Sequence, residues 1–122
     1  MIKEKRKILL IGGSGLLGKE ILKLDHSITA PTHDKLDITD IASIRVCLHD
    51  VEPDVLVLLA AATKPPLHDD HPEIGIRINI IGTAQVALAC QELGVRLVYT
   101  SSDYLYYGSG PHQEDEPVRA PN

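Results

Sequence analysis

The hydrophobic positions of residues 7–24 follow first a strand pattern and then a helix pattern. Residues 7–11 form a short apolar run that ends in glycines, which is typical of a buried strand. In residues 15–24 the apolar positions recur at helical spacing instead. They are Leu16, Leu17, Ile21, Leu22 and Leu24. The pattern therefore predicts a strand, a glycine turn and a helix.

The segment that follows has shorter hydrophobic runs. Residues 27–30 predict a second strand that stops at Pro31, and Leu36 with Ile38 predicts a very short third one. Thr39 or Asp40 then suits the N-cap of a helix that Pro53 ends. The apolar side of this helix would consist of Ile41, Ile44, Cys47, Leu48 and Val51.

The second half of the chain alternates in the same way. Residues 55–62 contain no charge, which favours a parallel strand covered on both faces. After a polar loop at 63–71, Pro72 suits the first turn of a long helix that runs to about Leu93, and Gly94 is a natural stop. Residues 95–100 predict another buried strand, and the chain beyond them reads as loop.

This order of elements predicts the fold class. Strands joined by right-handed helical crossovers lie in one doubly wound parallel sheet, so we expect a Rossmann-like α/β fold. No internal repeat or linker divides the chain. Residues 1–122 are therefore expected to form a single domain that stops after about the fifth strand.

Composition narrows the possible partners. The 122 residues have a formal charge of -5, which gives no basic footprint for nucleic acid. No apolar run approaches the roughly 18 residues of a membrane span, and no signal peptide is evident. We therefore expect a cytoplasmic protein that binds neither nucleic acid nor membrane. Cys47 and Cys90 lack Cys-x-x-Cys spacing and are expected to be buried, reduced thiols.

The glycine-rich stretch at residues 11–18 is the strongest local signal. It reads as G-x-G-x-x-G from Gly13 or as G-x-x-G-x-x-G from Gly12. Between a strand and a helix, either pattern lets the backbone approach a pyrophosphate, which the free N–H groups at the helix start then bind. The stretch predicts a dinucleotide site.

The choice between NAD and NADP stays open. An acidic residue about 20 positions after the glycines would hold the adenosine ribose and favour NAD. Asp34 suits that role, whereas His33 or Lys35 could meet the 2′-phosphate of NADP. A solvated turn would explain each of these side chains equally well.

Two other kinds of chemistry are less well supported. His68-Asp69-Asp70-His71 contains metal-ligating residue types, but a polar loop and helix cap explain it adequately, so no metal site is expected. No G-x-S-x-G elbow follows a strand, which disfavours a hydrolase. Ser101 and Ser102 leave the carboxyl end of a predicted strand, where α/β sheets place ligands and where hydroxyls also cap turns.

Several motifs together resemble the dTDP-4-dehydrorhamnose reductase family. They are Gly12-x-x-Gly15-x-x-Gly18, Leu36-Asp37-Ile38, Pro53-Asp54-Val55, Ala60-Ala61-Ala62, Asn79-x-x-Gly82-Thr83 and Ser101-Ser102-Asp103-Tyr104-x-Tyr106-x-Gly108, with Glu114-x-Glu116-Pro117 and Ala120-Pro121-Asn122 behind them. The resemblance covers nearly the whole chain in order. It implies the cofactor-binding half of an extended short-chain reductase that uses NAD or NADP on a 4-keto nucleotide sugar.

The resemblance also implies roles for individual residues. The Asp37 and Ile38 pair would border the adenine, Asn79 would support the active-site wall, and Ser102 would be the catalytic hydroxyl. The implied cofactor-binding set is Gly12, Ser14, Gly15, Leu16, Leu17, Gly18, His33, Asp37, Ile38, Ala60, Ala61, Ala62, Asn79, Thr100 and Ser101.

The chain departs from the family in its catalytic pair. None of its four tyrosines has Lys four residues later, and Lys64 is the last lysine. The later strands and the sugar-binding region are also not among these residues, and Leu58 stands where relatives often have Asn or His. We therefore expect no reductase turnover from this polypeptide alone, and an apolar sheet edge open to self-association.

A second resemblance suggests a different kind of function. The non-catalytic regulatory subunit of methionine adenosyltransferase has a similar Ser-Ser-Asp-Tyr segment and works by binding a partner enzyme. It implies a nucleotide-binding or regulatory protein rather than an enzyme.

Overall fold

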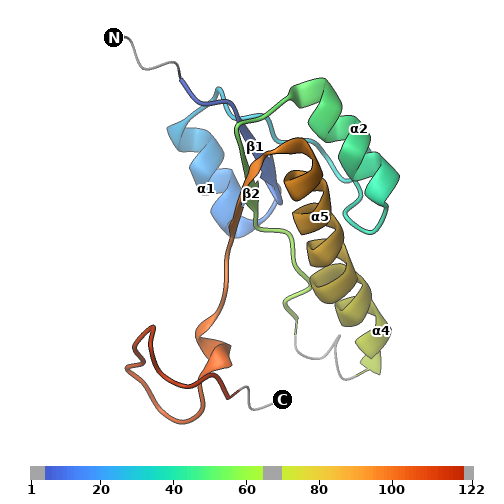
Figure 1. The fold of residues 1–122 in the computed structure, drawn as a ribbon. Coiled ribbons are helices and arrows are strands. Elements are labelled where there is room, and N and C mark those ends of the chain that lie inside the picture. The colour runs from blue at the N-terminus through green and yellow to red at the C-terminus, as the bar shows by residue number, and fades with distance from the viewer. Residues whose placement is uncertain (1–4, 65–69, 120–122) are drawn as a thin grey trace.

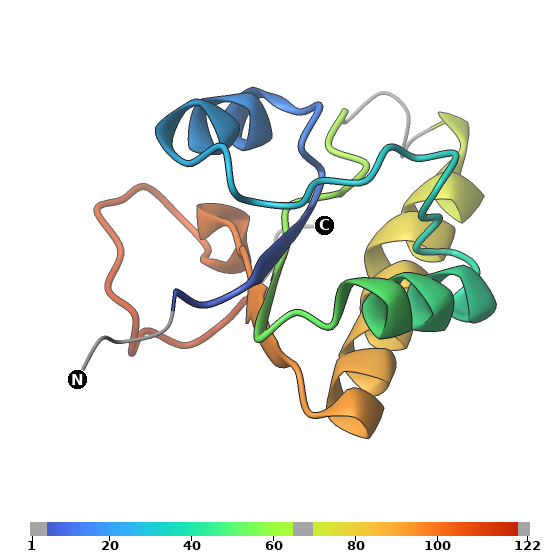
Figure 2. The same ribbon diagram turned by 90° about the horizontal axis from the view of Figure 1, so that it is seen from above.

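A parallel sheet with helices on both faces forms the body of the protein. The structure is a computed structural model that describes residues 5–64 and 70–119. Strands β1 (Ile8–Ile11), β2 (Val55–Leu58) and β3 (Arg96–Tyr99) are parallel and adjacent in that order. Helix α1 (Leu16–Leu24) covers one face, and α2 (Ile41–Val51) and α5 (Thr83–Leu93) cover the other (Figures 1 and 2). The predicted doubly wound α/β class is confirmed.

The main core lies between the sheet and the pair α2 and α5. Its buried members come from β1, β2, both helices and the segment before α2, since one face of each element is apolar. They are Leu9, Ile11, Leu36, Ile38, Ile44, Leu48, Leu56, Leu58, Val86, Ala89 and Cys90. Burial raises the pKa of the Cys90 thiol to about 11, and it also raises that of half-buried Cys47. Cys90 is therefore buried as expected, whereas Cys47 is only partly buried. The raised pKa values keep both side chains as thiols at neutral pH.

The long helix in the second half of the chain has an irregular centre. It begins as α4 (Pro72–Gly75), continues as the π-helix η1 (Ile76–Gly82) and ends as α5. Gly94 adopts the left-handed conformation, with φ 68°, and stops it as predicted. The predicted single helix is confirmed in extent, but its hydrophobic spacing gave no sign of the π segment.

Two of the predicted strands are wrong. Residues 27–30 reduce to one bridge, where the Thr29 amide donates to Ile8 and its carbonyl accepts from Leu10. Residues 36–38 form no strand: Leu36 and Ile38 are buried under the helices, while Asp37 between them makes a turn by bonding Thr39. Burial alone produced the alternating pattern.

Coverage of the sheet also differs from expectation. The strand predicted at 55–62 ends at Leu58, and β3 is largely exposed rather than buried, with Val98 44% accessible. On α1, Leu16 and Leu24 are 88% and 87% exposed, so they are not part of a buried stripe. The described residues place no helix over β3 on the α1 side.

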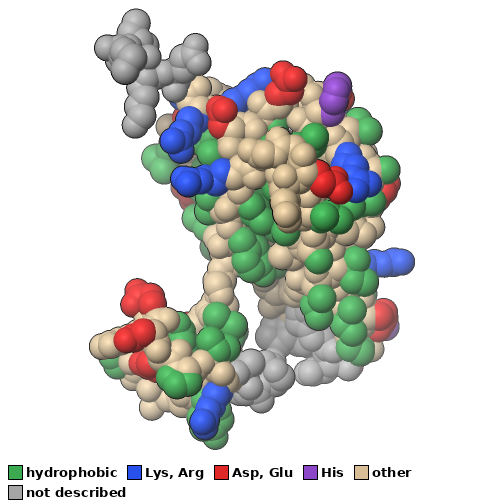
Figure 3. All heavy atoms as spheres, viewed as in Figure 1, with side chains coloured by type: hydrophobic (Ala, Val, Ile, Leu, Met, Phe, Trp, Pro, Cys, Tyr) green, Lys and Arg blue, Asp and Glu red, His purple; other side chains and the backbone are tan. Residues whose placement is uncertain are grey.

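Beyond β3 the chain forms an arm, residues 101–119, that stands away from the body (Figure 3). It starts with the short 3-10 turn η2 (Asp103–Leu105). The Arg119 amide donates to the Leu105 carbonyl at 2.8 Å and closes the arm into a loop.

One helix meets the length and composition of a membrane span, which the sequence analysis did not anticipate. It is Pro72–Leu93, with a mean hydropathy of 1.2. The signal is weak because core helices of soluble proteins satisfy the same criteria. Here the helix packs along α2, where the Arg45 guanidinium makes two hydrogen bonds to Glu92, at 2.8 and 2.9 Å.

Candidate functional site

The turn after β1 depends on glycines whose missing side chains let backbone segments touch. Gly12 has φ +101°, which favours glycine. A Cβ on Gly18 would lie 2.2 Å from the Gly12 carbonyl oxygen, inside any permitted contact. The Gly15 amide donates to the same carbonyl at 3.1 Å. The chain therefore folds back tightly enough for α1 to begin directly at the end of β1.

The start of α1 offers unpaired amides. Its first intrahelical bond runs from the Lys19 amide to the Gly15 carbonyl, and no side chain caps the helix. Within the described residues, the amides of Leu16, Leu17 and Gly18 therefore have no acceptor. Ser14 and Gly15 are exposed in front of them. An anion can reach the start of the helix at Leu16 and Leu17, which are exposed whereas Gly18 is buried, and the helix dipole favours its charge.

The loop after β2 lies directly against the glycine turn. A Cβ on Gly12 would lie 2.7 Å from the Ala60 amide nitrogen, so the two backbones are in contact. Asn79 fixes the far end of this loop: its Oδ1 accepts from the Ala62 amide at 2.8 Å, and its Nδ2 donates to the Ala62 carbonyl at 2.9 Å. Ala61 between them is exposed. Alanine and glycine thus leave room above the end of the sheet.

Asp37 lies on the side of β1 opposite to the loop after β2. Its Oδ1 accepts from the Thr39 amide and the Thr39 hydroxyl, each at 2.8 Å. These hydrogen bonds, with smaller contributions from His33 and Arg77, hold the pKa of Asp37 below its usual value. Asp37 therefore stays ionised at neutral pH.

The residues considered for the adenosine end of the cofactor are all surface groups: Asp34 for the ribose, and His33 or Lys35 for a 2′-phosphate. Hydrogen bonding by Thr32 lowers the pKa of Asp34. The geometry leaves all three available to a ligand and does not choose between NAD and NADP.

The hydroxyls at the end of β3 already have structural partners. Thr100 Oγ1 donates to the Leu58 carbonyl at 3.4 Å, and Ser102 Oγ accepts from the Tyr104 amide at 3.2 Å as the cap of η2. Ser101 is exposed beside them. Capping, which the sequence pattern left open, is therefore one role of Ser102.

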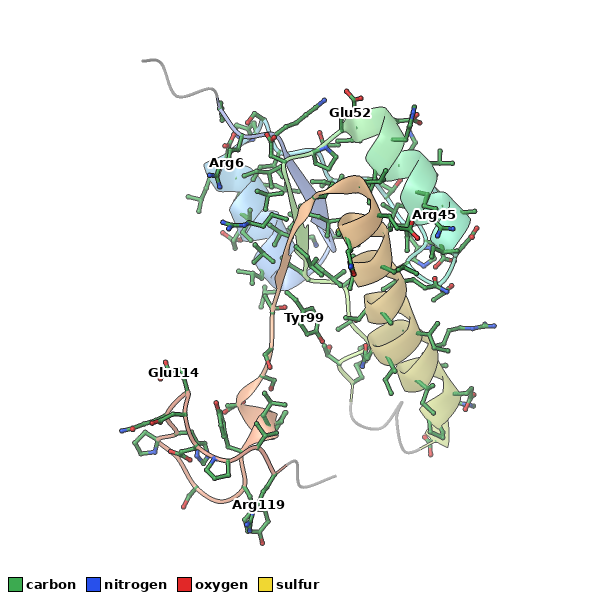
Figure 4. The ribbon with its side chains drawn as sticks, viewed as in Figure 1. Arg6, Arg45, Glu52, Tyr99, Glu114 and Arg119 are labelled. Atoms are coloured by element: carbon green, nitrogen blue, oxygen red, sulfur yellow. The ribbon has the colours of Figure 1, made fainter. Side chains whose placement is uncertain are left out.

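A pocket of about 580 Å³ lies beside these hydroxyls, within the arm. Its lining includes Ser102, Tyr106 and His112. The last two stack with ring centroids 5.1 Å apart, and His112 bonds Glu116 at 3.0 Å. This bond lowers the pKa of the Glu116 carboxyl. Figure 4 shows Tyr99 at the end of β3 and Glu114 and Arg119 on the arm beyond it.

The histidine and acid cluster at 68–71 gives no metal site in the described part of the chain. His68 and Asp69 lie outside the described residues. His71 bonds Glu73 at 3.2 Å. Among residues 5–64 and 70–119, no group of three or more ligating side chains converges.

Sequence reasoning missed three residues that shape the site. Arg77 stabilises the charge of Asp37 from the long helix, and Ser43 accepts from the Asp37 amide at 3.1 Å. Gly82 lets that helix approach Ile38, whose side chain would lie 2.9 Å from an added Cβ. The spacing Asn79-x-x-Gly82 was the available signal for the last of these; the other two had none, because they depend on packing.

The parallel sheet, the glycine turn and the open helix start define a Rossmann-type α/β protein. Residues 6–121 match the family described as the RmlD substrate binding domain. The chain belongs to this family.

Its relatives include two kinds of protein. The dTDP-4-dehydrorhamnose reductase of Streptomyces griseus is 36% identical over 116 residues, which are 90% of this chain and 38% of the relative. Methionine adenosyltransferase 2 subunit beta of Xenopus tropicalis is 27% identical over 127 residues, which are 95% of this chain and 38% of the relative.

The solved structure of a reductase is also similar to this chain. The dTDP-4-dehydrorhamnose reductase from Bacillus anthracis in complex with NADP superposes with a TM-score of 0.86 at 28% identity, over 97% of this chain and 44% of that one. The chain thus spans less than half the length of the relatives it matches.

Replacing Gly18 by alanine should unfold the glycine turn. The new Cβ would overlap the Gly12 carbonyl oxygen, and backbone clashes of this kind cost on the order of 3–4 kcal/mol. Gly15→Ala is the matched control, since its Cβ would lie 3.3 Å from the same oxygen, and it should cost less than about 1 kcal/mol. Urea unfolding measures both; equal stabilities of the two variants would contradict the close approach.

Proposed function

We propose that residues 1–122 form the NAD(P)-binding portion of a nucleotide-sugar reductase, with the substrate domain outside them. The observation that carries this proposal is the set of unpaired amides of Leu16, Leu17 and Gly18 above a glycine turn, with Leu16 and Leu17 exposed. Free amides at a helix start bind anions such as the pyrophosphate of a dinucleotide. A relative with NADP bound superposes on the chain, which supports a dinucleotide as the ligand.

The two halves of the cofactor would lie on opposite sides of β1. Asp37 and Ile38 would border the adenosine, with His33 near its ribose. Ala60, Ala61 and Ala62, with Thr100 and Ser101, would face the nicotinamide. A bound nicotinamide cofactor supplies the hydride.

Ser102 would hold the substrate carbonyl through its hydroxyl. Its Oγ accepts one bond from the Tyr104 amide at 3.2 Å and donates to Asp103 Oδ1 at 3.4 Å. A substrate carbonyl would take the place of the longer bond, the one to Asp103. The arm pocket beside it combines hydroxyls, carboxylates and a stacked ring pair, which are groups that bind sugars. We propose a 4-keto nucleotide sugar there, as in the S. griseus relative's class of reaction.

A non-catalytic role is the second candidate. It is favoured by the 27% identity to methionine adenosyltransferase 2 subunit beta over 95% of this chain. In that case the nucleotide site would serve binding or regulation of a partner enzyme. For either candidate we propose a cytoplasmic protein that binds neither nucleic acid nor membrane.

We also propose that copies of this polypeptide associate through β3. Its outer backbone groups have no neighbour strand in the described residues, and Val98 and Tyr99 are 44% and 52% exposed. Open, apolar strand edges pair with other strands.

The polypeptide should bind dinucleotides. Isothermal titration with NADPH, NADH and ADP-ribose is expected to give saturable binding of at least one, because all three present a pyrophosphate to the amides of α1. Gly18→Ala should abolish it. If none of the three ligands binds, the chain belongs to the family but lacks a dinucleotide site, and the proposal is wrong.

Turnover should be absent from the same preparation. Without a Tyr–Lys pair the sugar oxyanion has no proton donor, so a 4-keto sugar nucleotide should not cause steady oxidation of NADPH. Steady oxidation that Ser102→Ala abolished would contradict this expectation.

Self-association should weaken when a charge is placed on β3. Sedimentation at increasing concentration is expected to show dimers or larger species, and Val98→Lys should shift them toward monomer. Val46→Lys is the control, because Val46 is 61% exposed on α2, away from the edge. A monomer at all concentrations would refute the interface.

A further inference from the structure

The π-helical segment η1 touches both sides of the proposed cofactor site. At one position Asn79 makes two hydrogen bonds to Ala62, at 2.8 and 2.9 Å. Three residues later, Gly82 lies so close to Ile38 that an added Cβ would be 2.9 Å from its Cγ1 and Cδ1. Asn79 and Gly82 both belong to this π segment. The segment therefore contacts two loops that are far apart in sequence.

The two loops lie on opposite sides of β1. Ala62 follows β2, which pairs with one edge of β1. Ile38 follows the Thr29 bridge, which pairs with the other edge. In doubly wound folds the dinucleotide crosses the sheet at such a switch point, and its adenosine lies on the side of the second strand. Ala62 accordingly belongs to the nicotinamide side and Ile38 to the adenosine side.

The irregular geometry of the segment coincides with these contacts. The π stretch begins at Ile76 and ends at Gly82, so both contact residues lie within it. Such stretches are rare and are often found at functional sites. Their wider turn changes the direction in which side chains leave the helix, compared with the regular α-helix that continues from Thr83.

We infer that η1 sets the spacing between the two halves of the dinucleotide site. Asn79 is a positioning residue for the nicotinamide side because its carboxamide fixes the Ala60–Ala62 loop. Gly82 has no side chain, so Ile38 can pack directly against the helix on the adenosine side. The inference rests on the proposed function, since it assumes that a dinucleotide binds here, and it assigns neither residue a direct contact with the ligand.

Substitutions at the two positions should affect different parts of the ligand. Asn79→Asp keeps the shape and the acceptor but loses the donor, and sets a carboxylate against the Ala62 carbonyl. It should weaken NADPH or NADH binding about tenfold, the usual effect of losing one buried hydrogen bond, and leave ADP binding unchanged. Gly82→Ala should displace Ile38 and weaken ADP and the dinucleotide alike, by several-fold. Asn79→Leu removes both hydrogen bonds to Ala62 and should also weaken dinucleotide binding while leaving ADP binding unchanged.

Gln91→Ala is the control, because Gln91 is exposed on α5 and should change no affinity. Thermal unfolding and the exchange rate of the Ala62 amide show whether each variant folds and whether the loop is released. Faster exchange at Ala62 with selective loss of dinucleotide affinity is the expected result for Asn79→Asp.

Equal losses of ADP and dinucleotide in the Asn79 variants, or unchanged dinucleotide affinity, would overturn the inference while leaving the proposed function intact. Should the unmodified protein bind neither ADP nor a dinucleotide, the proposed function itself would fail. The two failures are therefore distinct.

Discussion

The site depends on the contact between backbone atoms at the end of β1. Gly18 packs on the Gly12 carbonyl, and Gly12 packs on the amide of Ala60, at separations that leave no space for a side chain. This contact brings the start of α1 beside the loop after β2. The first amides of α1 keep no protein acceptor because no side chain caps the helix. A single steric constraint thus creates both the shape of the site and its attraction for an anion.

The two faces of the sheet are packed unevenly. The buried core fills the space between the sheet and the pair α2 and α5, whereas α1 buries only Gly18. The well-packed side includes the long helix, which contacts Ala62 and Ile38. The other side includes β3 and the exposed leucines of α1. The positions of Ala62 and Ile38 therefore depend on the well-packed half of the molecule, whereas the amides of α1 lie on the half with less buried core.

The hydroxyl-rich segment after β3 combines structural and chemical roles. Ser102 caps η2 and also lines the arm pocket. The capping bond uses an oxygen lone pair of Ser102, while its hydroxyl proton makes only a long bond, 3.4 Å, to Asp103. The two roles are therefore compatible. The relatives include a reductase and a subunit of methionine adenosyltransferase.

Local periods, and residues with special backbone freedom such as Gly12 and Gly94, were enough to predict β1, β2, β3, the main helices and the glycine turn. They also put the strand-end alanines and Ser102 at one edge of the sheet, since parallel strands end there. The remaining features depend on packing. Leu36 and Ile38 alternate like a strand but are buried by helices that the local pattern does not describe, and the bonds of Asn79 and the contact of Gly82 join loops on opposite sides of β1. Such contacts arise from packing between segments distant in sequence, which no local spacing specifies.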